Sequence, residues 1–166
     1  MKKLLMILLM GLISYAKYTA QTKNGSLHDA AYELVQVLSD KTQAPILKPG
    51  QVLLEFDKSF RSTKQSKVVI DTTDFVPMEL ESTPELKTDK NQNHYLAITI
   101  KPEAAEKMKS FTAKRVMKEV VIVIKGKALS AYKIREAISG NQLEITGGSK
   151  KTCEDLLLKL KKDVKE

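Results

Sequence analysis

The stretch EVVIVIKGKALSAYK, residues 119–133, decides the fold. Residues 120–124 form an unbroken run of aliphatic, mostly β-branched side chains, which is typical of a strand covered on both faces or central in its sheet. Lys125-Gly126 is a turn signal, and residues 128–131 return as a second strand. The stretch therefore predicts a hairpin whose first strand belongs to the core through Val121 and Val123, or through Ile122 if the faces are reversed.

The chain after and just before this hairpin carries further strand and helix signals. Residues 95–100 alternate apolar and polar side chains, which predicts a strand. Pro102 suits the first turn of the helix that follows, where its missing N–H costs nothing. Leu143 and Ile145 mark a last strand, and Ser149 is expected to cap a final helix. Together these signals predict an α+β fold: a mostly antiparallel sheet with helices packed on one face.

The first half of the chain is more polar and its signals are weaker. Apolar residues recur at helical spacing within residues 26–43, which predicts an N-terminal helix that packs on its own domain or on a partner. Residues 51–56, 68–70 and 75–81 predict three strands. Pro77 has no N–H for a sheet ladder, so the third strand is expected at an edge or with a break. Residues 58–67 and 82–93 are polar and are expected to be loops.

Residues 1–16 have the layout of a secretory signal peptide. A basic start is followed by a short apolar run, and small residues precede a cleavage point between Ala16 and Lys17. The apolar run is shorter than the roughly 20 residues that a membrane-spanning helix needs. We expect residues 17–25 to be a flexible leader and residues 26–166 to be one α+β domain in the periplasm. An uncleaved segment anchored in the inner membrane is the alternative.

Composition excludes several kinds of site. One cysteine, Cys153, cannot form an internal disulfide or a cysteine-rich metal site. The 166 residues include two histidines, so His-based catalysis and metal binding have little to draw on. The net charge is +8, and without Lys2 and Lys3 it is +6, because 26 basic residues then face 20 acidic ones. A basic exported protein can meet anionic lipid, wall polymer or acidic proteins; nucleic acid is not expected in that compartment.

The residues from 95 to 161 resemble a known family. The segments ITIKPEAA at 98–105, VIVIKGKALSA at 121–131 and LEITG at 143–147 follow in the same order and spacing as in the head of the first periplasmic domain of SecD, an accessory subunit of the Sec protein-export machinery. The resemblance implies a soluble head that touches translocating polypeptide or partner proteins. It implies no proton-driven export, since the chain lacks the membrane helices of that motor. The chain thus looks like a free-standing exported head domain.

The candidate binding surface lies in the segment after the hairpin. Tyr132, Lys133 and Arg135 are close together in sequence, and Tyr and Arg are common interface anchors. Tyr132 also stands where the SecD-like pattern usually has proline. We expect these residues to contact protein partners in the cell envelope, unless Tyr132 merely covers a sheet edge while the two basic side chains are solvated.

Other chemical signals are weaker. Gly148, Ser149 and Lys150 lie where a strand leads into a helix and are a candidate weak anion site, although the spacing of a phosphate-binding loop is absent. Asp71, Asp74, Glu79 and Glu81 match no calcium loop and are expected on a solvated strand face. We predict no catalytic residue, no metal site and no cofactor. The predicted function is non-enzymatic binding or scaffolding in an envelope or secretion assembly; the alternatives are an exported enzyme or enzyme inhibitor, or a binder of anionic envelope surfaces.

Overall fold

The computed structural model describes residues 27–60 and 65–163. The predicted signal peptide, its cleavage point and the leader therefore lie outside the described residues. Within the described ranges the elements are β1 (Ala30–Ser39), β2 (Gln51–Glu55), β3 (Gln65–Pro77), β4 (Glu85–Thr88), β5 (His94–Thr99), α1 (Pro102–Ala113), β6 (Glu119–Ile124), β7 (Lys127–Lys133), β8 (Gln142–Ile145) and α2 (Lys150–Asp163). No helix in this part of the chain is long and apolar enough to cross a membrane.

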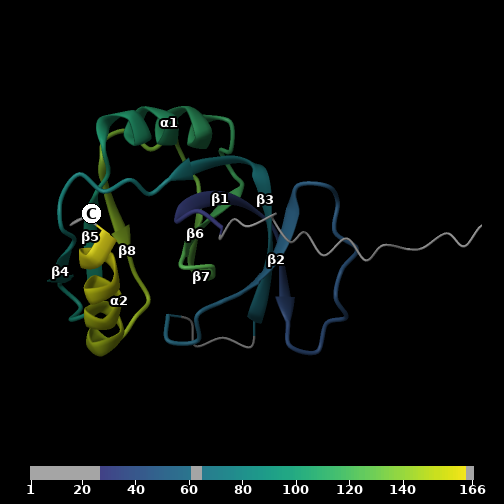
Figure 1. The fold of residues 1–166 in the computed structure, drawn as a ribbon, viewed down its shortest axis with the longest axis horizontal. Helices are drawn as coiled ribbons and strands as arrows, with labels where there is room; N and C mark the ends of the chain where they lie inside the picture. Colours follow the sequence, from purple (N-terminus) through teal and green to yellow (C-terminus); the bar gives the residue numbers. More distant parts are fainter. Residues whose placement is uncertain (1–26, 61–64, 164–166) are drawn as a thin grey trace, which may run out of the picture.

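The strands form two antiparallel sheets. One has the order β2-β3-β1-β6-β7 and the other the order β4-β5-β8. The smaller sheet and α2 lie side by side at one end of the molecule, and α1 lies above the space between the sheets (Figure 1). Buried side chains of both helices share one core with β6, so both helices pack on the same face of the larger sheet. The predicted α+β class is confirmed, with two sheets in place of one.

Strand β6 lies inside the larger sheet, as its aliphatic run predicts. Val121 and Val123 are fully buried on one face, in a core that includes Tyr32 and Ile70. Val120, Ile122 and Ile124 are buried on the other face, against the helices and the smaller sheet. Each face of this strand therefore supports a separate core, because alternate side chains of a strand point in opposite directions.

The larger sheet curls until its outer strands meet. Phe56, just after β2, forms a parallel bridge with Ala128 of β7. The amide of Asp57 donates a hydrogen bond of 2.8 Å to the Ala128 carbonyl. Phe56 and Ala128 are both buried in the core that the curled sheet encloses. This contact covers the edge of β7 at its first residues, whereas the later residues of β7 remain at the edge of the larger sheet.

The N-terminal helix predicted over residues 26–43 is wrong, because this segment contains β1. The strand pairs with β3 on one side and β6 on the other. The register with β3 shifts three times along the strand, and the shift between Leu34 and Gln36 leaves Val35 as an extra residue in β1, which advances its side-chain alternation by one residue. The apolar residues that face one core are therefore spaced irregularly, at positions 30, 32, 34 and 37. This spacing imitates a helical stripe, and pairing with two distant strands overrides it.

Two other expectations need correction. The short strands predicted at 68–70 and 75–81 belong largely to one strand, β3, which ends at Pro77. Its polar middle is a bulge in which Asp71 accepts hydrogen bonds from the amide and the hydroxyl of Thr73. The expected loop at 82–93 contains β4, which pairs with β5. Residues 61–64 of the other expected loop lie outside the described residues.

Candidate functional site

A largely apolar cavity of about 450 Å³ opens where the two sheets face each other. Strands β5, β6 and β8 contribute to its walls, together with the segment after β7. Its apolar lining includes Ile98, Ile122, Ile134, Ile138, Leu143 and Ile145. The volume lies in the range of small-ligand sites, and the cavity is open to the surface along one side of β8. We call this cavity the β7–β8 groove.

The groove runs along an edge of the smaller sheet. Strand β8 pairs with β5 on one side only, in the order β4-β5-β8. In an antiparallel ladder, alternate residues turn their N–H and C=O away from the partner strand. The Ile100 amide donates to the Asn141 carbonyl, so the ladder bonds fall on the odd-numbered residues of β8. The backbone of Gln142 and Glu144 therefore faces the groove.

Two hydroxyls of β7 reach across to the end of β8. The Tyr132 hydroxyl donates to the Glu144 carbonyl at 2.9 Å and accepts from the Thr146 amide at 3.2 Å. The Ser130 hydroxyl donates to the Thr146 carbonyl at 2.7 Å. Tyr132 lies opposite Val120 in the hairpin, so its ring is on the groove face of β7. These contacts join the two sheets without a continuous strand ladder.

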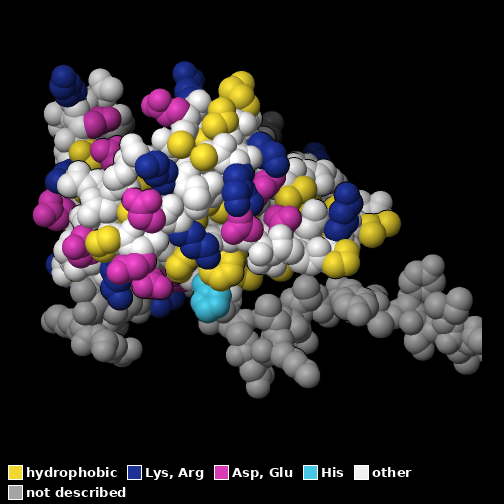
Figure 2. Space-filling model, turned by 90° about the horizontal axis from the view of Figure 1, so that it is seen from above, with side chains coloured by type: hydrophobic (Ala, Val, Ile, Leu, Met, Phe, Trp, Pro, Cys, Tyr) yellow, Lys and Arg dark blue, Asp and Glu magenta, His cyan; other side chains and the backbone are white. Residues whose placement is uncertain are grey.

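The three residues of the predicted interaction surface all line the groove. Tyr132 is half-buried in the lining, whereas Lys133 and Arg135 are exposed at the rim. Glu136 and Glu144 lie at the same rim, so the rim carries both signs of charge. Charges of both signs are also interspersed over the face seen in Figure 2, with hydrophobic side chains in small groups. The contribution of β8 was missed from the sequence, because nothing local links residues 142–146 to Tyr132.

The wall formed by residues 134–138 is held by the end of α1 and by the turn that follows it. The Met117 amide donates to the Ile134 carbonyl at 2.7 Å, and the Ile134 amide donates to the Lys118 carbonyl at 2.9 Å. The Ile138 amide donates to the Thr112 hydroxyl at 2.9 Å. The position of this wall therefore depends on where the C-terminal end of α1 lies.

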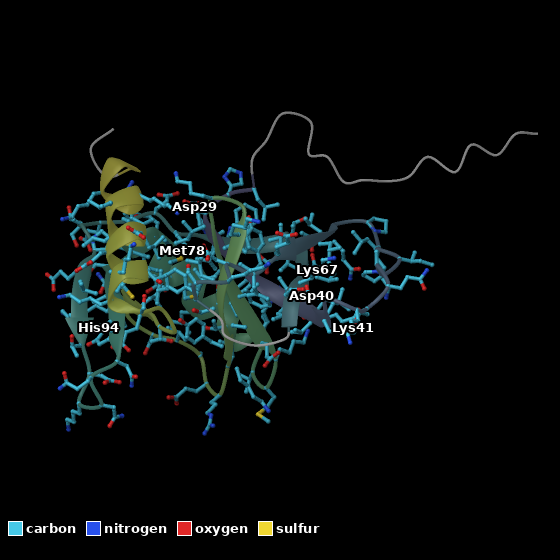
Figure 3. All side chains as sticks on the ribbon, turned by 90° about the horizontal axis from the view of Figure 1, so that it is seen from below. Asp29, Asp40, Lys41, Lys67, Met78 and His94 are labelled. Atoms are coloured by element: carbon cyan, nitrogen blue, oxygen red, sulfur yellow. The ribbon has the colours of Figure 1, made fainter. Side chains whose placement is uncertain are left out.

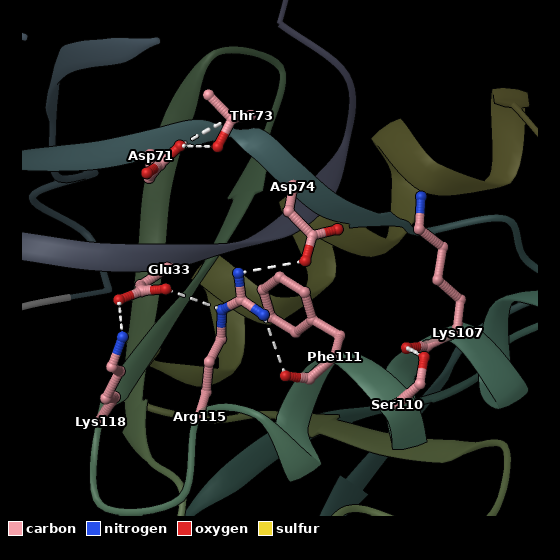
Figure 4. Close-up of polar contacts among 9 residues, drawn as sticks. All are labelled: Glu33, Asp71, Thr73, Asp74, Lys107, Ser110, Phe111, Arg115 and Lys118. Carbon is pink, nitrogen blue, oxygen red and sulfur yellow. Dashed lines mark hydrogen bonds and ion pairs between the residues drawn. The ribbon is translucent and has the colours of Figure 1, made fainter. Parts of the chain in front are cut away.

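Arg115 fixes that end of α1 on the larger sheet (Figure 4). Its Nε lies 2.9 Å from Glu33 of β1, and one terminal nitrogen lies 3.1 Å from Asp74 of β3. The other terminal nitrogen donates to the Phe111 carbonyl, and the guanidinium stacks over the Phe111 ring at 3.7 Å. Lys118 also pairs with Glu33, at 2.7 Å. The cluster therefore holds a largely buried Arg side chain between two carboxylates, a backbone carbonyl and an aromatic ring.

A second, more polar cavity of about 580 Å³ lies beside the start of α2 and includes Gly148 and Ser149 of the predicted anion site. The Ser149 hydroxyl accepts from the Thr152 amide at 3.2 Å, which confirms that Ser149 caps α2. Lys150 lies 3.9 Å from Glu154. The Ser149 hydroxyl and Lys150 therefore have roles within the helix, and anion binding at Gly148, Ser149 and Lys150 stays a prediction.

Two titratable groups of this polar cavity, Asp89 and His94, have partners within the hairpin formed by β4 and β5. The Asp89 carboxylate accepts hydrogen bonds from the Asn93 side chain and from the backbone amides of Asn93 and Asn91. These hydrogen bonds hold the pKa of Asp89 below its ordinary value. His94 contacts the Thr88 hydroxyl at 3.0 Å. It lies at the opposite end of the molecule from Lys41 and Lys67 (Figure 3).

The carboxylates weighed as a calcium site are engaged separately. Asp71 contacts Thr73, Asp74 contacts Arg115, and Glu79 lies 3.6 Å from Lys101. Glu81 accepts from the Asn141 side chain at 3.1 Å. No group of three or more potential metal ligands occurs among the described residues.

Cys153 is fully buried on the inner face of α2. Burial raises the pKa of the Cys153 thiol above its ordinary value. A thiol reacts as the thiolate, so this environment disfavours nucleophilic chemistry.

Comparison with known proteins places the chain in a family. A model of the family described as "SecDF, P1 head subdomain" matches residues 53–163, and no curated protein matches the chain. A solved structure described as "a membrane component SecDF that enhances protein export" is 28% identical, with a TM-score of 0.45, and the match covers 49% of this chain and 39% of that one. A second, "SecDF in Super-membrane-facing form", is 28% identical with a TM-score of 0.43, over 46% of this chain and 11% of that one. The matched region is thus less than half of either solved chain. Because the family model spans well over half of the sequence, the chain belongs to the SecDF P1 head subdomain family.

Proposed function

We propose that this chain is a non-enzymatic binding module of the cell envelope, and that it binds an extended apolar segment of a protein partner in the β7–β8 groove. One observation carries the proposal: an apolar cavity lies directly beside an open edge of β8. An unpaired strand edge presents N–H and C=O groups that can pair with an added strand.

An extended polypeptide satisfies both features of the groove at once. Its backbone can pair with the outward N–H and C=O groups of Gln142, while alternate side chains enter the apolar cavity. This is the chemistry of strand addition, in which the main chain gives affinity and side-chain pockets give selectivity. The rim favours neither sign of charge, since Lys133 and Arg135 are balanced by Glu136 and Glu144. We therefore expect selection for apolar, extended segments.

The family supports a role connected with protein export. One matched solved protein is described as a membrane component that enhances export, and a head of that kind would contact polypeptide or partner proteins. We propose that this chain acts in the periplasm after cleavage between Ala16 and Lys17. Intact mass of protein from a periplasmic extract tests this: a chain that begins at Lys17 supports it, and a full-length chain in the membrane fraction contradicts it.

The contacts of the polar side chains favour a binding role over a catalytic one. The polar cavity that an enzyme would need is lined by groups with local tasks: Asp89 holds its own turn and Ser149 caps α2. Lys127, at the start of β7, pairs with Glu55 at the end of β2 at 2.9 Å. On the described face in Figure 2, basic and acidic side chains are intermixed, which favours a protein partner over an anionic envelope polymer. We therefore place the protein-binding role first.

Peptide binding to purified protein tests the proposal. The probe is a fluorescein-labelled, ten-residue peptide of alternating valine and threonine, and the readout is fluorescence anisotropy. A peptide in which serine replaces valine should bind at least tenfold more weakly, because the groove then gains no apolar contact.

Two variants locate the binding surface. Leu143→Asp places a charge in the groove and should abolish binding, since Leu143 is half-buried in its wall. Ile46→Asp is the matched control, because Ile46 is 99% exposed in the loop after β1. Circular dichroism checks that both variants are folded. Loss of binding with Ile46→Asp, or full binding with Leu143→Asp, would contradict the assignment to the groove.

A further inference from the structure

We infer that Tyr132 determines how much of the β8 edge a bound polypeptide can use. Its hydroxyl occupies backbone groups of β8 that an added strand would otherwise pair with. The inference rests on the proposed function and adds the length and register of the segment that the groove accepts.

The hydroxyls divide the β8 edge into a closed and an open part. The Glu144 carbonyl and the Thr146 amide are taken by Tyr132, and the Thr146 carbonyl is taken by Ser130. The alternation of the ladder leaves the N–H and C=O of Gln142 and the N–H of Glu144 on the groove side. These groups contact neither hydroxyl, so a strand can pair at Gln142 and must stop before Thr146.

The ring of Tyr132 borders the open part of the edge. It lies on the groove face of β7, half-buried, beside the residues that line the cavity. An extended chain rises about 3.3 Å per residue, so the open part of the edge accommodates about two or three residues of a strand. Additional residues of a longer peptide would gain no backbone pairing with the natural protein.

The hydroxyl and the ring can be separated by substitution. Tyr132→Phe keeps the ring in the wall and removes the group that holds Glu144 and Thr146. Both of these residues are exposed, so water can satisfy their backbone groups in the unbound variant. A bound strand can then reach Thr146 and gain one or two hydrogen bonds. Each net bond corresponds to a change in affinity of roughly 3- to 10-fold.

The test compares two peptides with the natural protein and two variants. The peptides are labelled, end-capped sequences of alternating valine and threonine, four and eight residues long. We expect the natural protein to bind the two with affinities within about twofold. Tyr132→Phe should bind the eight-residue peptide roughly 3- to 10-fold more tightly and the four-residue peptide with unchanged affinity. Ser130→Ala is the matched control, because it frees only the Thr146 carbonyl and leaves the Tyr132 hydroxyl on the Glu144 carbonyl and the Thr146 amide.

Amide hydrogen exchange supplies a second readout. In the Tyr132→Phe complex, binding of the longer peptide should slow exchange at Thr146, whereas a merely structural tyrosine would give no such protection. Weaker binding of both peptides by Tyr132→Phe would overturn the inference, since the hydroxyl would then serve the ligand directly. An unchanged length dependence, with binding still abolished by Leu143→Asp, would overturn this inference alone. Absence of binding by every protein would overturn the proposed function and this inference with it.

Discussion

Replacement of Arg115 by methionine should destabilise the domain and loosen the groove wall. Methionine keeps much of the side-chain volume but removes the guanidinium. Two acidic side chains, Glu33 and Asp74, then lose a cation at 2.9 and 3.1 Å, and the Phe111 carbonyl loses its donor. The change acts where α1 joins β1 and β3 (Figure 4).

The exposure of each partner sets the size of the effect. Removing one member of a buried ion pair costs about 3–5 kcal/mol. The Arg115 side chain is 10% exposed, but Asp74 is 43% exposed and can turn to water, and Glu33 keeps Lys118 at 2.7 Å. We therefore expect the free energy of unfolding to fall by about 2–3 kcal/mol, below the fully buried case.

Urea denaturation followed by circular dichroism measures this loss. Lys118→Met is the matched control: Lys118 also pairs with Glu33, but its side chain is 55% exposed, so the cost should be below about 1 kcal/mol. Amide exchange at Ile134 and Ile138 should accelerate in Arg115→Met, because the end of α1 and the turn after it hold these two residues. An Arg115→Met variant that unfolds at the same urea concentration as the natural protein would refute the account of this cluster.

Three further predictions address the core and the titratable groups. Val121→Ala should lower the free energy of unfolding by about 2–4 kcal/mol, because Val121 is fully buried; Val35→Ala, at a 46% exposed position, should cost less than about 1 kcal/mol, and equal urea midpoints would contradict the placement of β6. Cys153 should react with iodoacetamide at pH 8 far more slowly in the native protein than in urea, since burial raises its thiol pKa; equal rates would show an exposed thiol. Hydrogen bonds from Thr73 lower the pKa of Asp71 in the folded state. The stability that these hydrogen bonds add is therefore fully present above the ordinary Asp pKa, near 4, and is lost as the pH falls through the lower folded-state pKa. Thr73→Val should reduce this acid-dependent loss in pH-resolved urea titrations, and an unchanged pH profile would contradict the assignment.

The sequence predicts well where local signals and final contacts agree. The aliphatic run of β6 is buried on both faces, as such a run requires. Pro102 opens α1 and Ser149 caps α2, each within its own turn of helix. These features depend on residues a few positions apart, so periodicity and capping rules are sufficient to find them.

The failures arise where distant strands decide the outcome. Residues 30–39 carry a helix-like spacing because a β-bulge at Val35 interrupts the alternation of β1, and their pairing partners lie 26 or more residues away. The groove likewise depends on contacts between Tyr132 and Glu144, residues on different sheets. Residue type selected Tyr132, Lys133 and Arg135 as a candidate surface, whereas the second wall of the groove follows from the tertiary arrangement alone.

The backbone amides of β8 provide the most direct test of the polypeptide-binding groove. Amide chemical shifts of ¹⁵N-labelled protein should be recorded during titration with the ten-residue valine–threonine peptide. The account predicts that Gln142 and Glu144 shift most and that their amides become protected from exchange, while amides of the loop after β1, around Ile46, stay unchanged. Shifts confined to that loop or to the outer face of α2, with Gln142 and Glu144 unaffected at saturation, would contradict the account.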